Sequence, residues 1–171
     1  MAKHHRPVFF IGPRACGKTS VGQRLARILQ RRFIDTDQAL QERCGCTIAD
    51  MTARHGWEYF RDEESRTLEL CTAPDTIIAT GGGMVLRAAN RDFMRRHGNV
   101  FYLCAPADIL AARLCRNPIA TQRPSLTGKS IAEEAADILR QRAPLYEGCA
   151  RHIVDATLPL DALLRLIIHN I

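Results

Sequence analysis

Lysine is almost missing from this chain, although the chain is basic. Its formal net charge is +6, and only three of its 24 basic residues are lysines: Lys3, Lys18 and Lys129. The arginines form no basic tail and accompany no recognised nucleic-acid-binding motif, so we do not expect nucleic acid as a partner. The charge equally suits an enzyme that handles anionic nucleotides and an anionic substrate. Because lysine is so rare here, a lysine that falls within a sequence motif is not explained by general surface charge.

Long apolar runs are also missing. No run approaches the roughly 18–20 residues that span a bilayer, and residues 1–6 lack the apolar segment of a signal peptide. We therefore expect a cytoplasmic protein without a membrane partner. The 171 residues, 46% of them apolar, suffice for one sizeable core but are short for two. The expectation is a single domain over 1–171, acting as a monomer.

The seven cysteines show no paired C-x-x-C spacing, and their number is odd. We expect reduced thiols. Cys44 and Cys46, separated by one residue, are weak evidence for a metal site on their own.

Short apolar runs alternate with segments of helical period, which indicates an α/β fold with a parallel sheet covered on both faces. The predicted strands are 7–11, 32–35, 76–80, 99–104 and 151–155. The predicted helices are 18–31, 48–54, 58–71, 87–97, 107–116, 131–142 and 160–169.

A phosphate-binding loop (P-loop) follows the first predicted strand and opens the first predicted helix. It consists of Gly12, Pro13, Arg14, Ala15, Cys16, Gly17, Lys18 and Thr19. Its glycines allow backbone N–H groups to point at phosphates, Lys18 can reach the β- and γ-phosphates, and the Thr19 hydroxyl can hold Mg²⁺. A chance match is the alternative. The strand–loop–helix context favours binding of a nucleoside triphosphate.

Two aspartates follow the second predicted strand, separated by Thr36. In an extended segment, Asp35 and Asp37 would lie on the same side, facing the P-loop. We expect Asp35 near the metal and Asp37 as the acceptor of a substrate hydroxyl proton. The alternative for each is a helix N-cap, and Asp37 suits that role before residues 38–40.

Three glycines, Gly81, Gly82 and Gly83, follow the third predicted strand. They could form a simple flexible turn, or they could let a second substrate approach the backbone closely. Two arginines are candidates for gripping that substrate. Arg61 shares a helix face with Glu64, which could orient it or merely form an ion pair with it, and Arg142 comes late in a helix, where a cation is expected anyway.

Residues 117–129 break the pattern because they are rich in Pro, Thr, Ser, Gly and Gln. An ordinary loop is one interpretation. A lid over about 115–129 is the other, because phosphoryl transfer must exclude water.

Taken together, these residues resemble the shikimate kinase family, and details of the P-loop and of the chain end are similar to its second bacterial type. The motifs that carry the resemblance span most of the chain: residues 12–19, 33–37, 60–64, 79–83, 122–124, 142–146 and 154–157. The resemblance implies a three-layer α/β/α P-loop kinase fold with a five-stranded parallel sheet in the order 2-3-1-4-5, a substrate-binding helical region at about 36–63, and a lid. The implied reaction uses ATP and Mg²⁺ to phosphorylate the 3-hydroxyl of shikimate in aromatic amino-acid biosynthesis.

The resemblance also implies a role for each matching residue. Asp37 would bind the reacting hydroxyl, Arg61 and Arg142 the carboxylate, and the three glycines the ring substituents. The transferred phosphoryl group would be neutralised by Lys18 and Arg123. Thr19 and Asp35 would organise Mg²⁺, and Arg113 would pack against adenine.

Two other functions compete with this interpretation. A gluconate-type sugar-acid kinase also pairs a P-loop with an anionic polyol, but the aspartate pair, the triple glycine and Arg142 argue against it. A regulatory GTPase is disfavoured because the sequence has neither N-K-x-D nor D-x-x-G.

Overall fold

Five parallel strands form the centre of the molecule. The structure is a computed structural model and describes residues 5–116 and 129–171. The strands are β1 (Val8–Ile11), β2 (Arg32–Asp35), β3 (Thr76–Ala79), β4 (Asn99–Cys104) and β5 (His152–Asp155). Their order is β2-β3-β1-β4-β5 and every pairing is parallel, which confirms the expected sheet. Each predicted strand is found within one residue of its expected ends.

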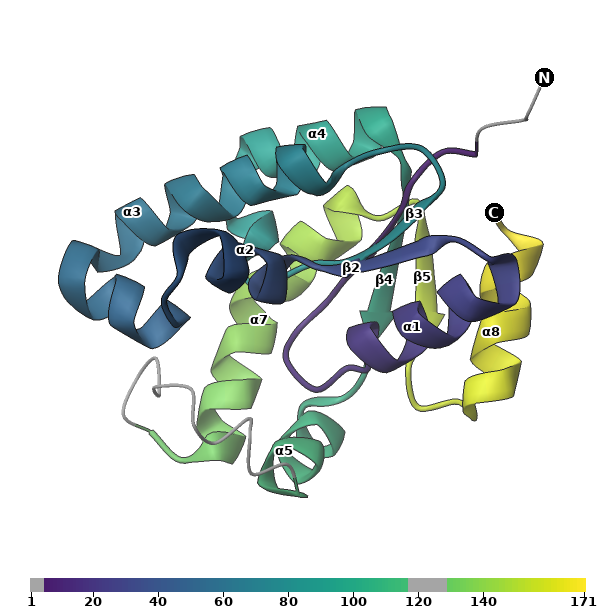
Figure 1. Ribbon diagram of the computed structural model, residues 1–171. Coiled ribbons are helices and arrows are strands. Elements are labelled where there is room, and N and C mark those ends of the chain that lie inside the picture. Colours follow the sequence, from purple (N-terminus) through teal and green to yellow (C-terminus); the bar gives the residue numbers. More distant parts are fainter. Residues whose placement is uncertain (1–4, 117–128) are drawn as a thin grey trace.

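Helices cover both faces of this sheet (Figure 1). Within the described residues they are α1 (Lys18–Leu29), α2 (Thr36–Cys44), α3 (Ile48–Cys71), the 3₁₀ turn η1 (Met84–Leu86), α4 (Ala88–His97), α5 (Ala107–Arg116), α7 (Ile131–Cys149) and α8 (Leu160–His169). One face packs against α1, α5 and α8. The other packs against α3, η1, α4 and α7. The fold is therefore the predicted three-layer α/β/α arrangement.

Alternation along β1 divides its side chains between the two main cores. Phe10 contributes to the core under α1 and α8, whereas Phe9 and Ile11 contribute to the core under α3 and α7. A third, smaller core lies between α2 and α3, away from the sheet, and is built on Leu40, Met51 and Phe60. The main sheet cores thus position the P-loop, and the small core positions the helices that follow β2.

Three helix predictions need correction. Helix α2 lies in the region at about 36–63 that the resemblance implied to be helical, but it was not among the helices predicted from periodicity, since its nine residues bury only Thr36 and Leu40 and show weak helical periodicity. The helices predicted at 48–54 and 58–71 form one element, α3, interrupted at Gly56, whose φ of 83° is accessible mainly to glycine.

The predicted end of a helix at Arg142 is also wrong. Helix α7 continues through Pro144 to Cys149. Pro144 cannot donate a helical hydrogen bond, but the turn beyond it buries Tyr146 and Cys149 in the core. That burial offsets the lost bond.

Two further observations concern the described residues. No helix among them combines the length and the apolar character that a bilayer span requires. All seven cysteines lie in the described ranges, and none of them forms a disulfide.

Two helical glycines provide a test of the packing. A Cβ at buried Gly22 in α1 would lie 2.5 Å from Cε2 of Phe33, whereas a Cβ at exposed Gly148 in α7 would meet no atom within 4 Å. We expect Gly22→Ala to lower the free energy of unfolding by about 1–3 kcal/mol through overpacking, despite alanine's better helix propensity. Gly148→Ala should instead raise it by up to about 1 kcal/mol. Urea unfolding measures both, and stabilisation by Gly22→Ala would contradict the packing described.

Candidate active site

The segments that follow β1, β2 and β3 meet at the carboxyl edge of the sheet, where parallel sheets bind ligands. Gly82 lies directly beside the P-loop. A Cβ on Gly82 would be 3.5 Å from the Gly12 carbonyl oxygen and 3.7 Å from the Arg14 nitrogen. The P-loop and the triple-glycine turn therefore form adjoining walls of one site.

The P-loop has the backbone that its glycines predict. Gly12 and Gly17 have φ values of 146° and 100°, and Ala15 has a φ of 61°, in the left-handed region. Lys18 folds over the loop, and its Nζ donates to the carbonyl oxygens of Gly12 at 2.8 Å and Pro13 at 2.7 Å. The loop thus holds a positive charge at its own surface. Arg14 and Cys16 complete the loop, and Cys16 is buried.

Arg113 ties the P-loop to the far end of the chain. From α5, its guanidinium donates to the carbonyl oxygen of Ala15 at 3.3 Å and to that of Ala156, just beyond β5, at 2.8 Å. Arg113 therefore stands between the P-loop and the connection from β5 to α8.

Asp35 and Asp37 do not share an extended segment, contrary to expectation. Asp35 ends β2 and caps α2, its Oδ1 accepting from the backbone N–H groups of Asp37 at 3.0 Å and Gln38 at 3.3 Å. The N-cap alternative is thus correct for Asp35. It is not correct for Asp37, the residue that was predicted to suit that role. Asp37 lies in the first turn of α2.

The remaining oxygen of Asp35 faces the P-loop. The Thr19 hydroxyl donates to Oδ2 of Asp35 at 2.9 Å, so a hydroxyl and a carboxylate lie side by side at the start of α1. Mg²⁺ prefers oxygen ligands and is commonly held by one or two carboxylates together with substrate phosphates. The two side chains fit a magnesium ion.

The glycine turn is closely packed against acidic side chains. A Cβ on Gly81 would lie 2.5 Å from Oδ1 of Asp37 and 2.9 Å from Oε1 of Glu64, which leaves no room for a larger residue. The Gly81 N–H donates to the buried Thr36 hydroxyl at 3.0 Å. Glycine at this position therefore lets the carboxylates of α2 and α3 come up to the backbone.

Arg61 and Arg142 reach the same turn from different helices. A Cβ on Gly83 would lie 2.5 Å from Nη2 of Arg61, and Nη1 of Arg142 donates to the Gly82 carbonyl oxygen at 3.2 Å. Since α7 runs to Cys149, Arg142 lies well inside the helix, so its position is not explained by a helix C-terminus. The structure brings both predicted arginines together.

Glu64 holds Arg61 in place. Its Oε2 accepts from Nη1 of Arg61 at 2.6 Å, and the carboxylate is only 2% exposed. Burial raises the pKa of Glu64, nearby Asp37 adds to the rise, and the positive charges of Arg61 and Arg142 oppose it. The Arg61 guanidinium also lies 4.9 Å from the ring centre of Phe60 and 5.7 Å from that of Trp57. These contacts fix the orientation of the guanidinium.

Two functional neighbours were missed by sequence reasoning, and one predicted residue is not described. Thr36 and Tyr146 both bind the glycine turn, but neither had a predicted role, because only their contacts reveal it. Arg123 and residues 117–128 of the predicted lid lie outside the described residues.

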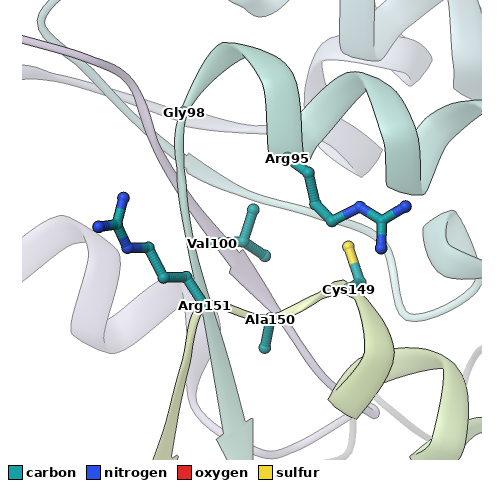
Figure 2. Close-up of a pocket in the computed structure, with 6 residues that line it drawn as sticks. All are labelled: Arg95, Gly98, Val100, Cys149, Ala150 and Arg151. Atoms are coloured by element: carbon teal, nitrogen blue, oxygen red, sulfur yellow. The ribbon is translucent and has the colours of Figure 1, made fainter.

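A separate pocket of about 190 Å³ lies at the opposite edge of the sheet, before β4 and β5 (Figure 2). Its lining includes Arg95, Cys149 and Arg151. Figure 2 shows the two guanidinium groups pointing away from each other. Burial raises the pKa of the Cys149 thiol to about 11, which leaves it protonated at neutral pH. This pocket gathers no reactive groups comparable to those around the glycine turn.

Comparison with known proteins agrees with this geometry. A sequence model of the shikimate kinase family matches residues 14–171. The chain belongs to the shikimate kinase family. Among curated relatives, "Shikimate kinase 2" of Dickeya chrysanthemi is 52% identical over 157 residues, covering 92% of this chain and 91% of that protein. "Shikimate kinase 2" of Escherichia fergusonii is 53% identical over 152 residues, covering 89% and 84%.

Solved shikimate kinase structures share the fold. The structure described as shikimate kinase from Acinetobacter baumannii in complex with shikimate has a TM-score of 0.87 and 31% identity, covering 97% of this chain and 94% of that chain. A gluconokinase from Sinorhizobium meliloti has a TM-score of 0.56 at 18% identity, covering 96% and 90%. At that identity the likeness to the gluconokinase extends only to the fold.

Proposed function

We propose that this chain is a shikimate kinase, which transfers the γ-phosphoryl group of ATP to the 3-hydroxyl of shikimate and yields shikimate 3-phosphate and ADP. The supporting observation is the meeting of Arg61 and Arg142 at a glycine turn that adjoins both Asp37 and the P-loop. This arrangement supports a donor site beside an acceptor site for a small anionic alcohol. The reaction belongs to the biosynthesis of aromatic amino acids.

Two arginines suit the carboxylate of shikimate. A planar guanidinium can donate two parallel N–H bonds to a carboxylate, which fixes the acceptor's orientation as well as its charge. The ion pair with Glu64 keeps the Arg61 guanidinium directed at the glycine turn. The backbone of Gly81–Gly83 would let the hydroxylated ring approach without meeting a Cβ.

Asp37 would act on the hydroxyl that attacks the phosphoryl group. Its carboxylate lies against Gly81, and the next residue, Gly82, adjoins the P-loop. There it would accept a hydrogen bond from the 3-hydroxyl, orient it, and take its proton as the phosphoryl group transfers. Most of the rate enhancement would come from holding the two substrates in line, with little covalent chemistry by the protein.

The donor side would bind ATP through the whole P-loop. Backbone N–H groups of residues 12–19 would cradle the phosphates, Lys18 would leave its loop carbonyls for the β- and γ-phosphates, and Arg113 would pack against adenine. Thr19 and Asp35 would hold Mg²⁺, which supplies positive charge against the phosphate oxygens. Arg123, on a lid at about 115–129, would add a second positive charge near the transferred group.

The remaining features of the proposal concern the whole chain. Residues 1–171 form one kinase domain, in which the region at about 36–63 binds the acceptor. The protein acts in the cytoplasm as a monomer, without a nucleic-acid or membrane partner.

ADP release coupled to NADH oxidation tests the function directly. With ATP and Mg²⁺ present, we expect turnover that depends on shikimate and negligible turnover with gluconate, which shares the carboxylate and the hydroxyls but not the ring. Equal or faster turnover with gluconate would contradict the proposal. Trp57 is the sole tryptophan and lies beside Arg61, so its fluorescence offers a reading of acceptor binding that does not depend on catalysis.

Removal of either arginine should affect one substrate selectively. We expect Arg61→Ala and Arg142→Ala each to raise KM for shikimate about 30-fold or more, since losing a buried charged partner costs about 2–5 kcal/mol, while KM for ATP stays nearly constant. Matched controls are Arg66→Ala on α3 and Arg140→Ala on α7, both exposed arginines on the same helices. An equal rise in both KM values would argue against a carboxylate-binding role.

Replacing the carboxylate of Asp37 should separate binding from chemistry. We expect Asp37→Asn to bind ATP normally but to lose roughly 10²–10⁴-fold in kcat, because the amide cannot take the hydroxyl proton. Nucleotide titration and steady-state rates on the same preparation measure the two effects. A variant with unchanged kcat would remove Asp37 as the base.

A further inference from the structure

Tyr146 contacts the acceptor site although the function proposed above assigns it nothing. It lies four residues after Arg142 on α7, so both side chains lie on the same helix face. Tyr146 is fully buried, and its ring stacks on that of Tyr102 from β4, with ring centres 5.0 Å apart. The ring is therefore fixed by the core, while the hydroxyl reaches the glycine turn.

The Tyr146 hydroxyl and Arg142 bind the same atom. The hydroxyl donates to the Gly82 carbonyl oxygen at 2.6 Å, and Nη1 of Arg142 donates to it at 3.2 Å. A carbonyl oxygen has two lone pairs, so these two donors satisfy it fully. The tyrosine bond is the shorter of the two. Burial also raises the pKa of Tyr146, so the hydroxyl keeps its proton and remains a donor at neutral pH.

Binding of an anionic acceptor would change this arrangement. A carboxylate is a much stronger acceptor for a guanidinium than a neutral carbonyl is, so the long bond from Arg142 to Gly82 is the one to be given up. The Gly82 carbonyl would then lose a partner at the closely packed glycine turn, where an unsatisfied polar group is costly. Tyr146 would remain as its donor.

We propose that Tyr146 is a positioning residue for the acceptor. Its hydroxyl holds the Gly82 carbonyl, so Arg142 is free to exchange that carbonyl for the carboxylate of shikimate. Without the hydroxyl, the carbonyl competes with the substrate for Arg142. This inference rests on the proposed function, because it takes shikimate as the ligand of Arg142.

The main test is Tyr146→Phe, which removes the hydroxyl and keeps the stacked ring. We expect KM for shikimate to rise about five- to tenfold, the effect of one hydrogen bond, with less than about twofold change in kcat and in KM for ATP. The control is Tyr102→Phe, which removes a hydroxyl from the stacked neighbour. That hydroxyl has no hydrogen bond to the residues that the structure describes. The control should retain the KM of the unchanged enzyme.

A double-mutant comparison separates positioning from a general structural role. In the Arg142→Ala background, Tyr146→Phe should weaken shikimate binding by less than about twofold, measured by Trp57 fluorescence, because there is no guanidinium left to release. The same five- to tenfold effect in both backgrounds would overturn the inference. So would an unchanged KM in Tyr146→Phe alone.

A measurement on the unchanged protein covers the case in which Tyr146→Phe fails to fold. The chain has three tyrosines, so labelled tyrosine allows the hydroxyl proton of Tyr146 to be followed by NMR. We expect a slowly exchanging resonance that persists and moves downfield when shikimate is added, as Tyr146 becomes the remaining donor to Gly82. Its loss on binding would overturn the inference. Absence of shikimate turnover in the unchanged enzyme would overturn the proposed function and, with it, this inference.

Discussion

The close packing around Gly81, Gly82 and Gly83 is the constraint on which the site depends. Each glycine adjoins a different element: Gly81 donates to Thr36 at the start of α2, Gly82 accepts from Tyr146 of α7, and Gly83 lies against Arg61 of α3. A Cβ at the first or the third position would displace a charged side chain. The turn is therefore the point at which α2, α3 and α7 are set relative to one another.

The same turn connects the acceptor side to the nucleotide side. Gly82 touches the P-loop, and the P-loop is in turn fixed through Arg113 to the connection between β5 and α8. These segments are far apart in sequence and meet because parallel strands bring their carboxyl ends to one edge. On the function proposed above, the positions of donor and acceptor would thus be coupled through backbone atoms.

Sequence reasoning was most successful where periodicity was strong. The five strands were predicted within one residue, and among them β1 and β3 are short, mostly apolar and fully buried. The P-loop was predicted because its spacing is constrained by the phosphates that such loops bind. Sequence reasoning failed where tertiary contacts decide the outcome. Helix α2 has a weak apolar face, α7 runs through Pro144 because Tyr146 and Cys149 are buried beyond it, and Asp35 became the cap in place of Asp37. The shared bond of Arg142 and Tyr146 to Gly82 left no pattern in the sequence.

The small core between α2 and α3 is expected to be less stable locally than the two cores beneath the sheet. Leu40, Met51 and Phe60 provide little apolar burial compared with the two cores beneath the sheet, and Gly56 interrupts α3 beside them. Local opening free energies follow such differences in buried contacts. We therefore expect α2 and the start of α3 to open at a lower free-energy cost than the sheet and its flanking helices. On the function proposed above, part of the affinity for the acceptor would then be spent on ordering these helices.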